Sequence, residues 1–600
     1  MGQDSGVDLR KGPIYRIGAA ALVAVMAAFF VAVWIICLKH TDGYFTYTLD
    51  DPYIHLGIAK NMAFHGVWGV TEYGNTSASS SPLWTGLLAL TIWVAGDSVY
   101  WPLAFGILFS VAATLLIYVR FVSRGMAVVL SVIAATAIFL AGPLHVLPFT
   151  GMEHSLQIFL DLLFVFWLVD VLGRKSGSRD LIIAVLLPAL MCLSRYESVF
   201  VIFVPVIVCL CRREWRLALF LIAGPIVGIG GFALYSHAMG MPAIPNSIMI
   251  KGNMPKTTAA DFFASIFGRI RALLQAETLT ISDLLILAVI SGLVLRFTSL
   301  RASTGPLRTA IWTAVSACIL HASLASFGWF FRYEAYLVVL LATVCILAWR
   351  EMLAFRGPRE EASVTTRAWI AVVVSICAAQ FALAKVFSYR TPREDLIILA
   401  IVVGGLAALR KGALTRGRLA RTVLIWVVPI SFYFMIQDRP MLSMEDVPKG
   451  SRDIYIQQIQ MSRFIARFYP TGRLACNDIG AVTYYSQVHL LDLYGLATDE
   501  IRRQKLARKF GTESIGKQID LFKPDVIIAY PSWFAGDHKF PDSIISVASW
   551  IIPPITSAGS STVTFYATNR QNADQVRRHL QQFQPSLPNS VRVEWYKAPG

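Results

Sequence analysis

Residues 17–38, IGAAALVAVMAAFFVAVWIICL, form an unbroken run of apolar side chains. About 20 such residues in a helix span the hydrocarbon core of a bilayer, and this run exceeds the apolar core of a cleaved signal peptide. No small-residue cleavage site follows it, so the sequence predicts an uncleaved membrane anchor. Further apolar runs follow at 83–96, 101–119, 126–142, 155–173, 181–193, 198–211, 217–236, 282–296, 309–327, 334–349, 368–388, 395–409 and 422–436.

The composition supports the same class of protein. Of the 600 residues, 56% are hydrophobic and only 15% are charged, which is far from the balance of a soluble protein. The sequence therefore predicts a polytopic α-helical membrane protein with about 13 transmembrane helices. A net charge of +16 could suggest nucleic-acid binding, but no basic stripe with interleaved aromatic residues is present.

The basic residues predict the orientation in the membrane. They cluster in short loops, as at Arg174/Lys175/Arg179, Arg212/Arg213/Arg216 and the stretch 410–421, and such loops are typically cytoplasmic. The loops at 39–82, 143–154, 194–197, 237–281 and 328–333, together with everything after about 437, are then expected outside. Within 82–142 the parity fails, so either 83–96 or 101–119 is expected to be interfacial or re-entrant.

The last part of the chain changes character. We expect a transmembrane domain over 1–437, with the external catalytic loop at 39–82, and an extracytoplasmic α/β domain over 438–600. Helical spacing is expected at Gln457–Tyr469 and near 499–510 and 513–522. The predicted strands are Arg473–Cys476, Val488–Leu493, Asp525–Ala529, Thr562–Ala567 and Val591–Trp595.

Ionisable residues gather on the predicted outer face, many of them at helix mouths. Carboxylates and cations that converge on one membrane face suit an anionic, lipid-borne substrate, because cations can hold a phosphate and a carboxylate can move a proton. The candidates include Asp50, Asp51, His55, Glu153, Arg195, Glu197, Lys251, Arg332 and Glu334.

Each candidate also has a structural interpretation. Arg195 and Glu197 could form a local ion pair, and Arg332 could simply extend to the lipid headgroups. A solvated side chain is the default for Lys251. Glu153 and the adjacent His154 could bind a metal ion, but two neighbouring residues fix no coordination geometry.

Short motifs in a fixed order carry a resemblance to a known family. They are the Asp50-Asp51 pair after the first helix, a first external loop that ends in Ser-Pro-Leu-Trp84, then Thr-Gly-Met-Glu153, Arg195-Tyr-Glu197, Pro245-Asn-Ser with Lys251, Arg332-Tyr333, Asn477-Asp-Ile-Gly480 and Asp492-Leu-Tyr-Gly-Leu496. Over nearly the whole chain they resemble the GT-C membrane glycosyltransferases, and in motif order the branch that contains the mycobacterial terminal arabinofuranosyltransferase. Relatives more often carry Arg-Pro-acid where this chain has Arg195-Tyr196-Glu197.

The resemblance implies an inverting glycosyltransferase. Such an enzyme takes a sugar from a polyprenyl-phosphate donor on the outer face of the cytoplasmic membrane and transfers it to an envelope glycan or lipid. It implies a base in the first external loop, at Asp50 or Asp51, and phosphate contacts among Lys251, Arg332 and Arg195. His55, Glu197 and Tyr333 are the expected substrate-positioning residues. No cofactor is assigned, and dependence on a divalent cation is left open.

The two adjacent aspartates are expected to differ in role. Asp51 precedes Pro52, and the segment Pro52–Phe64 is predicted to form an amphipathic helix near the membrane surface, with Asp51 as its N-cap. That placement gives Asp51 a structural reason, so Asp50 is the preferred candidate for the general base, and Asp51 and Glu153 are the candidates for orienting the acceptor.

Two other function classes stay open. A secondary transporter also has charges within the membrane, but it should show two halves of related hydropathy, and none is found here. A non-catalytic envelope assembly protein is the third class. The sequence names neither the donor sugar nor the acceptor.

Overall fold

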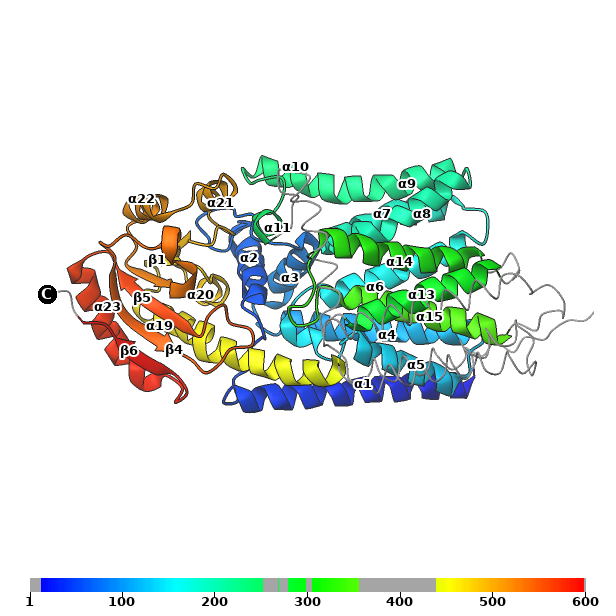
Figure 1. Cartoon of the computed structure of the whole chain (residues 1–600), viewed down its shortest axis with the longest axis horizontal. Coiled ribbons are helices and arrows are strands. Elements are labelled where there is room, and N and C mark those ends of the chain that lie inside the picture. The colour runs from blue at the N-terminus through cyan, green and yellow to red at the C-terminus, as the bar shows by residue number, and fades with distance from the viewer. Residues whose placement is uncertain (1–11, 252–267, 269–278, 298–304, 355–438, 598–600) are drawn as a thin grey trace, which may run out of the picture.

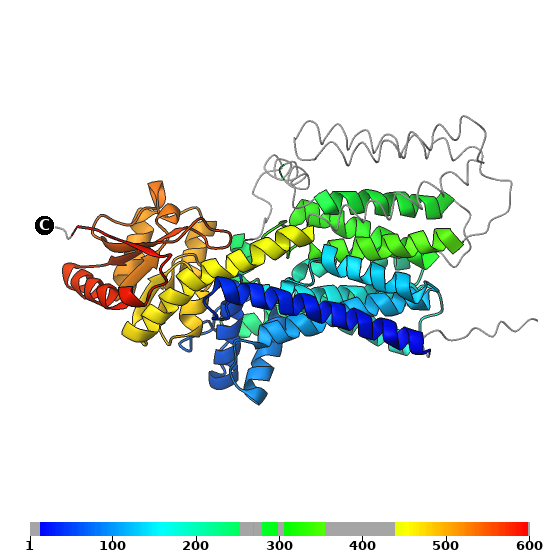
Figure 2. The same ribbon diagram turned by 90° about the horizontal axis from the view of Figure 1, so that it is seen from below.

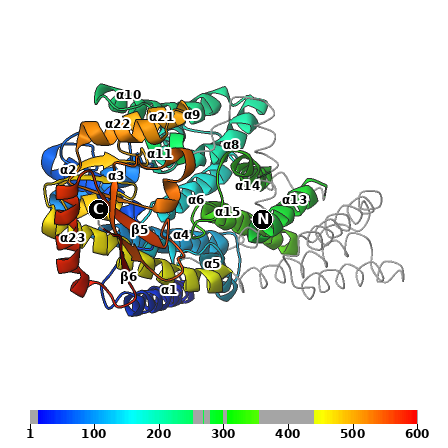
Figure 3. The ribbon, with the colours of Figure 1, turned by 60° about the vertical axis from the view of Figure 1, so that its left-hand side comes forward.

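The computed structural model describes residues 12–251, 268, 279–297, 305–354 and 439–597. A bundle of long helices forms one end of the molecule, and a sheet domain, which we define as residues 455–597, forms the other (Figure 1). Helices α2 (Asp51–His65) and α3 (Pro82–Ala95) lie at the junction between these two parts. Figure 3, in which the sheet domain is turned toward the viewer, shows α2 and α3 at the same junction.

The bundle confirms a helical membrane protein. Among the described residues, six helices are long and apolar enough to cross a bilayer: Pro13–His40, Trp101–Ser123, His154–Val171, Trp215–Ala238, Gly305–Leu324 and Ala335–Met352. The helices α5 (Val128–Ala141), α7 (Ser178–Ser194), α8 (Val199–Cys211) and α13 (Leu279–Phe297) complete the described bundle. The apolar runs at 368–436 lie outside the described residues, so the expected count of about 13 crossings stays a prediction.

The ambiguous region 82–142 forms three helices of unequal length. Helix α4 (Trp101–Ser123) has 23 residues, whereas α3 and α5 have 14 each. Fourteen residues rise only about 21 Å, which is less than the bilayer core. Because α3 also packs against α2 at the junction, it fits the expected interfacial segment at 83–96 better than α4 does.

Small residues allow close packing within the bundle. The segment Trp215–Ala238 crosses α7, and a Cβ atom on Gly224 would lie 2.7 Å from the Pro188 side chain. A Cβ on Gly228 would lie 2.7 Å from the carbonyl oxygen of Ala189. The two glycines therefore serve helix–helix contact, as small residues spaced by four do in membranes.

Helix α2 confirms the predicted helix after the first anchor, but its setting differs from the expectation. Residues 52–59 are buried on every side, because α3 packs on one face and α20 (Gly480–Tyr484) of the sheet domain on another. The helix ends at Gly66, whose left-handed φ of 68° suits a glycine C-cap. The expectation of an amphipathic helix is therefore wrong for its N-terminal half, and its position near the membrane surface stays a prediction.

The sheet domain confirms the predicted α/β character of the C-terminal part. Its six strands run in the order β2-β1-β3-β5-β4-β6, with parallel pairs at β1–β2 and β1–β3 and antiparallel pairs elsewhere. The strands are β1 Arg473–Cys476, β2 His489–Asp492, β3 Val526–Ala529, β4 Ile545–Ile551, β5 Thr562–Ala567 and β6 Arg592–Trp595; the helices include α19 Gln460–Phe468, α21 Asp499–Leu506, α22 Thr512–Phe522 and α23 Arg570–Phe583.

Strand β4 and helix α23 were not expected from the sequence. Strand β4 reads ISVASWI, in which serines interrupt the apolar residues, yet it lies between β5 and β6. Helix α23 is largely polar and presents only a narrow buried stripe that includes Val576 and Leu580. Both elements depend on tertiary partners that a local pattern does not reveal.

A helix over 439–454 leads from the bundle into the sheet domain and runs beside α1 (Pro13–His40) (Figure 2). The Ser451 hydroxyl contacts the Cys37 sulfur at 3.9 Å and the Thr48 hydroxyl at 3.4 Å. The first anchor, the first external loop and the sheet domain are thereby tied together. The expected boundary at 437/438 falls at the edge of the undescribed segment 355–438 and stays a prediction.

Candidate functional site

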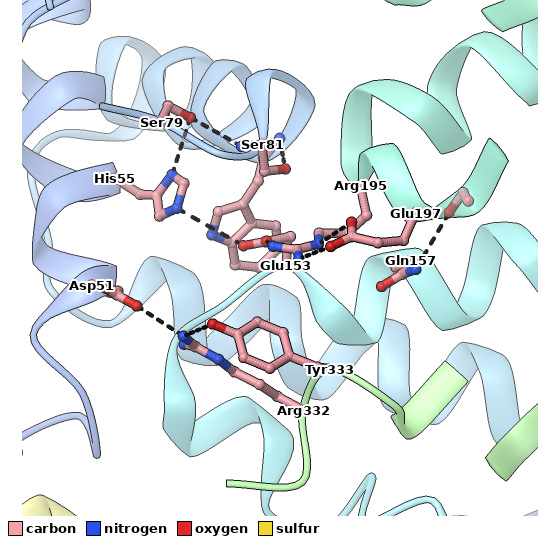
Figure 4. Close-up of polar contacts among 12 residues, drawn as sticks. Asp51, His55, Ser79, Ser81, Glu153, Gln157, Arg195, Glu197, Arg332 and Tyr333 are labelled. Carbon is pink, nitrogen blue, oxygen red and sulfur yellow. Dashed lines mark hydrogen bonds and ion pairs between the residues drawn. The ribbon is translucent and has the colours of Figure 1, made fainter. Parts of the chain in front are cut away.

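A cavity of about 330 Å³ lies where the bundle, α2 and the sheet domain meet. Nine residues were expected to act as base, phosphate ligand or positioning residue, and six of them line the cavity: Asp51, His55, Arg195, Glu197, Arg332 and Tyr333 (Figure 4). Their side chains come from α2, from the turn between α7 and α8, and from the segment that precedes α15 (Ala335–Ala354). Motifs separated by almost 300 residues thus converge on one space.

Arg195 is held by two carboxylates. Its Nη1 donates to Glu153 Oε1 at 2.8 Å, while Nε and Nη2 donate to the two carboxylate oxygens of Glu197 at 3.1 and 2.6 Å. The Glu153 side chain is fully buried and does not line the cavity, so it acts on the site through Arg195. The local ion pair that competed with a ligand role for Arg195 is present.

Arg332 is bonded far less completely. Its Nη2 donates to Asp51 Oδ2 at 2.9 Å and to the Tyr333 hydroxyl at 3.0 Å. The side chain is only 2% exposed, and its Nε and Nη1 have no hydrogen-bond partner among the described residues. Buried guanidinium nitrogens without partners cost free energy, which a bound anion would recover. Arg332 does not simply extend to the lipid headgroups.

An unusual turn positions Arg332. The three residues before it, Trp329, Phe330 and Phe331, have φ values of 52°, 63° and 60°, which bulky side chains rarely adopt. Glu334 stabilises the turn, because it accepts from the Gly328 amide at 2.8 Å and from Arg439 Nη2 at 2.9 Å. Strained backbone of this kind is concentrated at functional sites.

His55 faces the Glu153 side of the site. Its Nδ1 lies 2.8 Å from the Thr85 hydroxyl, which in turn lies 2.9 Å from the Ser79 hydroxyl. Its Nε2 lies 3.9 Å from Glu153 Oε2. Burial lowers the pKa of His55, with Glu153 and Asp51 opposing that shift, so the imidazole is neutral at pH 7.

Asp50 is turned away from the cavity. Its two carboxylate oxygens accept from the amides of Gly480 and Ala481 at 2.6 and 2.8 Å. A Cβ on Gly480 would lie 2.1 Å from the Asp50 carbonyl oxygen, so this close approach requires glycine. Burial raises the pKa of Asp50 and Asp478 adds to the rise, while the two amides oppose it.

The helix start differs from the sequence expectation. Helix α2 begins at Asp51, which places Asp50 at the N-cap position, and no side chain caps the first amides. Asp51 is therefore not the N-cap; its carboxylate pairs with Arg332 at the cavity wall. The reason is tertiary, since the sheet domain binds Asp50 and fixes the chain just before the helix.

Several lining residues were missed as site residues, although their motifs were noted. Asn246 connects the first loop and the sheet domain, since its amide donates to Ser77 O at 2.9 Å and its side chain to Leu496 O at 3.0 Å. Ser247, Ile248 and Leu496 consequently reach the cavity. Lys251 is the last residue of α11 (Asn246–Lys251), and its side chain lies outside the described residues.

No cluster of three or more histidines, cysteines or carboxylates that could hold a metal ion occurs within the described parts of the chain. The Glu153-His154 pair gains no third ligand there, and the His154 ring instead lies edge-on to Tyr333.

Comparisons with known proteins give one family match and similar solved structures, two of which are of one protein in different states. A family described as "Domain of unknown function (DUF8728)" matches residues 452–566. No curated protein matches the chain. The crystal structure of ArnT from Cupriavidus metallidurans bound to undecaprenyl phosphate is similar at 12% identity and a TM-score of 0.47, covering 91% of this chain and 98% of that one. Its apo state gives 13% identity and a TM-score of 0.45, with 92% and 99% covered.

Proposed function

We propose that this protein is an inverting glycosyltransferase of the GT-C type, which moves a sugar from a polyprenyl-phosphate donor to an envelope glycan or lipid on the outer face of the cytoplasmic membrane. One observation carries the proposal: the Asp51 carboxylate forms an ion pair, in the wall of one cavity beside a membrane bundle, with Arg332, whose Nε and Nη1 have no partner among the described residues. Transfer from a phosphate needs both groups, a base for the acceptor hydroxyl and a cation for the leaving group.

Arg332 is the proposed principal phosphate ligand. Its Nε and Nη1 remain available to phosphate oxygens while Nη2 keeps its bond to Asp51. Arg195 contributes less, because two carboxylates already occupy its guanidinium. As the bond between the anomeric carbon and the phosphate oxygen breaks, negative charge grows on that oxygen, and a guanidinium already in place stabilises it.

A third cation is needed for charge balance. The described charges of the site are three carboxylates and two guanidiniums, so it carries one more negative than positive charge before any phosphate binds. Lys251 follows the cavity-lining Ser247 and Ile248 by four and three residues. That spacing puts all three positions on one helix face. Lys251 therefore remains our candidate for the second phosphate contact.

We assign the general base to Asp51, which exchanges the roles first expected for the two aspartates. Asp51 lines the cavity, and its side chain is 23% exposed. Asp50 has both oxygens bonded to backbone amides of the sheet domain and does not line the cavity. Asp51 takes the proton of the acceptor hydroxyl as that oxygen attacks the anomeric carbon opposite the phosphate. The new glycosidic bond then forms with inversion.

The remaining candidates position these groups. Glu153 and Glu197 hold Arg195, His55 contributes a neutral imidazole to the cavity wall, and Tyr333 bonds to Arg332. The apolar side chains of Phe200 and Leu324, which also line the cavity, offer a surface for the first prenyl units of the donor. A sheet domain outside the cytoplasm and membership of the terminal arabinofuranosyltransferase branch belong to the same proposal.

The direct test is turnover by the full chain in proteoliposomes. Lipid-linked sugars extracted from the native membrane are supplied, and released polyprenyl phosphate is followed by mass spectrometry. We expect release that depends on an added envelope-glycan acceptor. Movement of lipid-linked sugar between leaflets without release would favour transport, and the glycosyltransferase proposal would fail.

A further inference from the structure

A second cavity, of about 270 Å³, opens where the C-terminal half of α2 faces the sheet domain. One wall consists of α2 from Gly57 to His65 together with residues 71–72 of the first loop, and the other consists of residues 466–470 and 483–487. We call this cavity the α2 groove. None of the glycosyl-transfer steps above uses it.

Both kinds of hydrogen-bonding group line the groove. Asn61, Ser486 and Gln487 each carry a donor and an acceptor, Glu72 carries acceptors only, and the partly exposed ring of Tyr485 adds an apolar face. Sugar hydroxyls need donors and acceptors together, while the C–H faces of a sugar ring pack against aromatic rings. The chemistry of the wall therefore suits a carbohydrate.

The basic side chains of the groove lie beside carboxylates. Lys60 lies 3.3 Å from Asp97, and His65 lies 3.3 Å from Glu72. The Lys60 ammonium also lies over the Tyr484 ring, 5.2 Å from its centroid. A cation already opposed by a carboxylate attracts a phosphate or a uronate only weakly. The groove consequently favours a neutral ligand.

The two walls are fixed to each other in advance. The Tyr73 hydroxyl donates to the Gln487 carbonyl oxygen at 3.0 Å, and the Tyr73 ring stacks on His489 with 3.7 Å between centroids. On the other side, Tyr484 donates to Asp97 at 2.8 Å. A groove held open by such contacts loses little conformational entropy when it binds a ligand.

Helix α2 connects the groove to the reaction site. Asp51 and His55 lie in its first turns at the site, and Lys60, Asn61 and His65 follow at the groove. The rise from Asp51 to Lys60 is about 14 Å, and their nine-residue separation places them on opposite sides of the helix. Because residues 52–59 are buried, an acceptor chain in the groove reaches Asp51 only by passing around the outside of α2 and the elements packed on it.

We propose that the α2 groove binds the acceptor as a neutral oligosaccharide, several residues back from the hydroxyl that receives the new sugar. The identification as an acceptor rests on the function proposed above. The site itself, a neutral-glycan groove shared by α2 and the sheet domain, does not. The proposal gives the sheet domain a role in holding the acceptor.

The test uses the full chain in nanodiscs on an array of neutral and anionic bacterial oligosaccharides. Gln487→Trp fills the groove from an exposed position, and Gln582→Trp, on the exposed face of α23, is the matched control. We expect the wild type and Gln582→Trp to bind neutral oligosaccharides, and Gln487→Trp to bind them at least about tenfold more weakly. Binding by Gln487→Trp equal to wild type, or no neutral binding by the wild type, would overturn the groove assignment.

Two further measurements separate this inference from the proposed function. Arg332→Gln should bind neutral oligosaccharides normally while it loses affinity for a long-chain polyprenyl phosphate. If Arg332→Gln binds polyprenyl phosphate as well as the wild type does, the result counts against the proposed glycosyltransferase function and not against the ligand assigned to the α2 groove. Gln487→Trp could instead weaken binding to phosphatidylglycerol vesicles or anionic glycans and leave binding to neutral glycans unchanged. That result would assign the groove to a charged ligand and overturn the inference.

Discussion

The tripeptide Arg-Tyr-Glu occurs twice at the site, at 195–197 and 332–334, and the two copies behave differently. In the first copy Arg195 and Glu197 bond to each other. In the second, Glu334 turns to Arg439 and the Gly328 amide, and Arg332 turns to Asp51. The same three residues yield a saturated ion pair in one place and, in the other, a guanidinium with two nitrogens that have no partner among the described residues.

The backbone explains the difference. Arg195 is extended, with φ −151° and ψ 132°, and it leads directly into the short helix that carries Glu197. Arg332 instead follows a left-handed turn of three bulky residues. The carboxylates that pair with the two arginines also differ. Arg195 pairs with the buried Glu153, whereas Arg332 pairs with Asp51 at the cavity wall. Partner and backbone together therefore separate the saturated Arg195 from Arg332, which we propose as the phosphate ligand.

The largest expected effect concerns Asp51, the carboxylate that pairs with Arg332 of the second copy. Asp51→Asn should lower turnover by about 10²–10⁴-fold, because the acceptor hydroxyl loses its base. Asp50→Asn should lower the melting temperature instead, since one of its two bonds to sheet-domain amides is lost. Turnover and thermal unfolding of both variants in the same detergent check this. A fully active Asp51→Asn protein would return the base to Asp50 or end the proposed mechanism.

Removing the first arginine should damage the fold. Arg195→Gln leaves Glu153 buried without its cation, and breaking a buried ion pair by removing one partner costs about 3–5 kcal/mol. We expect a large fall in the melting temperature and little correctly folded protein. Glu197→Gln is the milder control, because Arg195 keeps its bond to Glu153. A stable Arg195→Gln protein with weak donor binding would make the two copies alike.

Removing the second arginine should damage binding. Arg332→Gln should weaken binding of a long-chain polyprenyl phosphate by about tenfold or more, because the two unpartnered nitrogens are lost. Asp51 keeps partial exposure to solvent, so the loss of stability should be smaller than for Arg195→Gln. Native mass spectrometry measures the first quantity and thermal unfolding the second. Normal affinity together with a low melting temperature contradicts the assignment.

Six of the nine residues that the sequence predicted for the site line one cavity. The sequence could not predict which of them acts as base, phosphate ligand or structural support. Hydrophobic runs and strand patterns depend on local spacing, so the bundle helices and five of the strands followed from them. The bond from Asp50 to Gly480 spans 430 positions, and the left-handed turn before Arg332 contains no glycine except Gly328. Roles that depend on such distant or strained contacts need coordinates.

A smaller effect is the pH dependence of thermal stability that His55 contributes. Burial lowers the pKa of His55, so the unfolded chain binds a proton at this position more readily than the folded protein. Its contribution to stability is present above pH 6.5 and is lost as pH falls below that value. The groups facing it are Glu153, Asp51 and the two arginines. Between pH 7.5 and 5, the melting temperature of the wild type should fall more steeply than that of His55→Gln; parallel curves would show a freely protonated ring.

The smallest expected effect tests the turn itself. Trp329 has φ 52° and a side chain that is 46% exposed, so its replacement removes little packing. Trp329→Gly and Trp329→Ala both delete the ring, but alanine in a left-handed conformation costs about 1–2 kcal/mol. We expect the glycine variant to be the more stable by about 1 kcal/mol in thermal unfolding.

Tyr196 supplies the matched control, because it lies in a short 3-10 helix and has no positive φ. There the order should reverse, with Tyr196→Ala more stable than Tyr196→Gly, since glycine loses more backbone entropy on folding. The same order at both positions would mean that the left-handed turn does not distinguish the two arginines. Opposite orders would tie the unpartnered nitrogens of Arg332 to the conformation of the three residues before it.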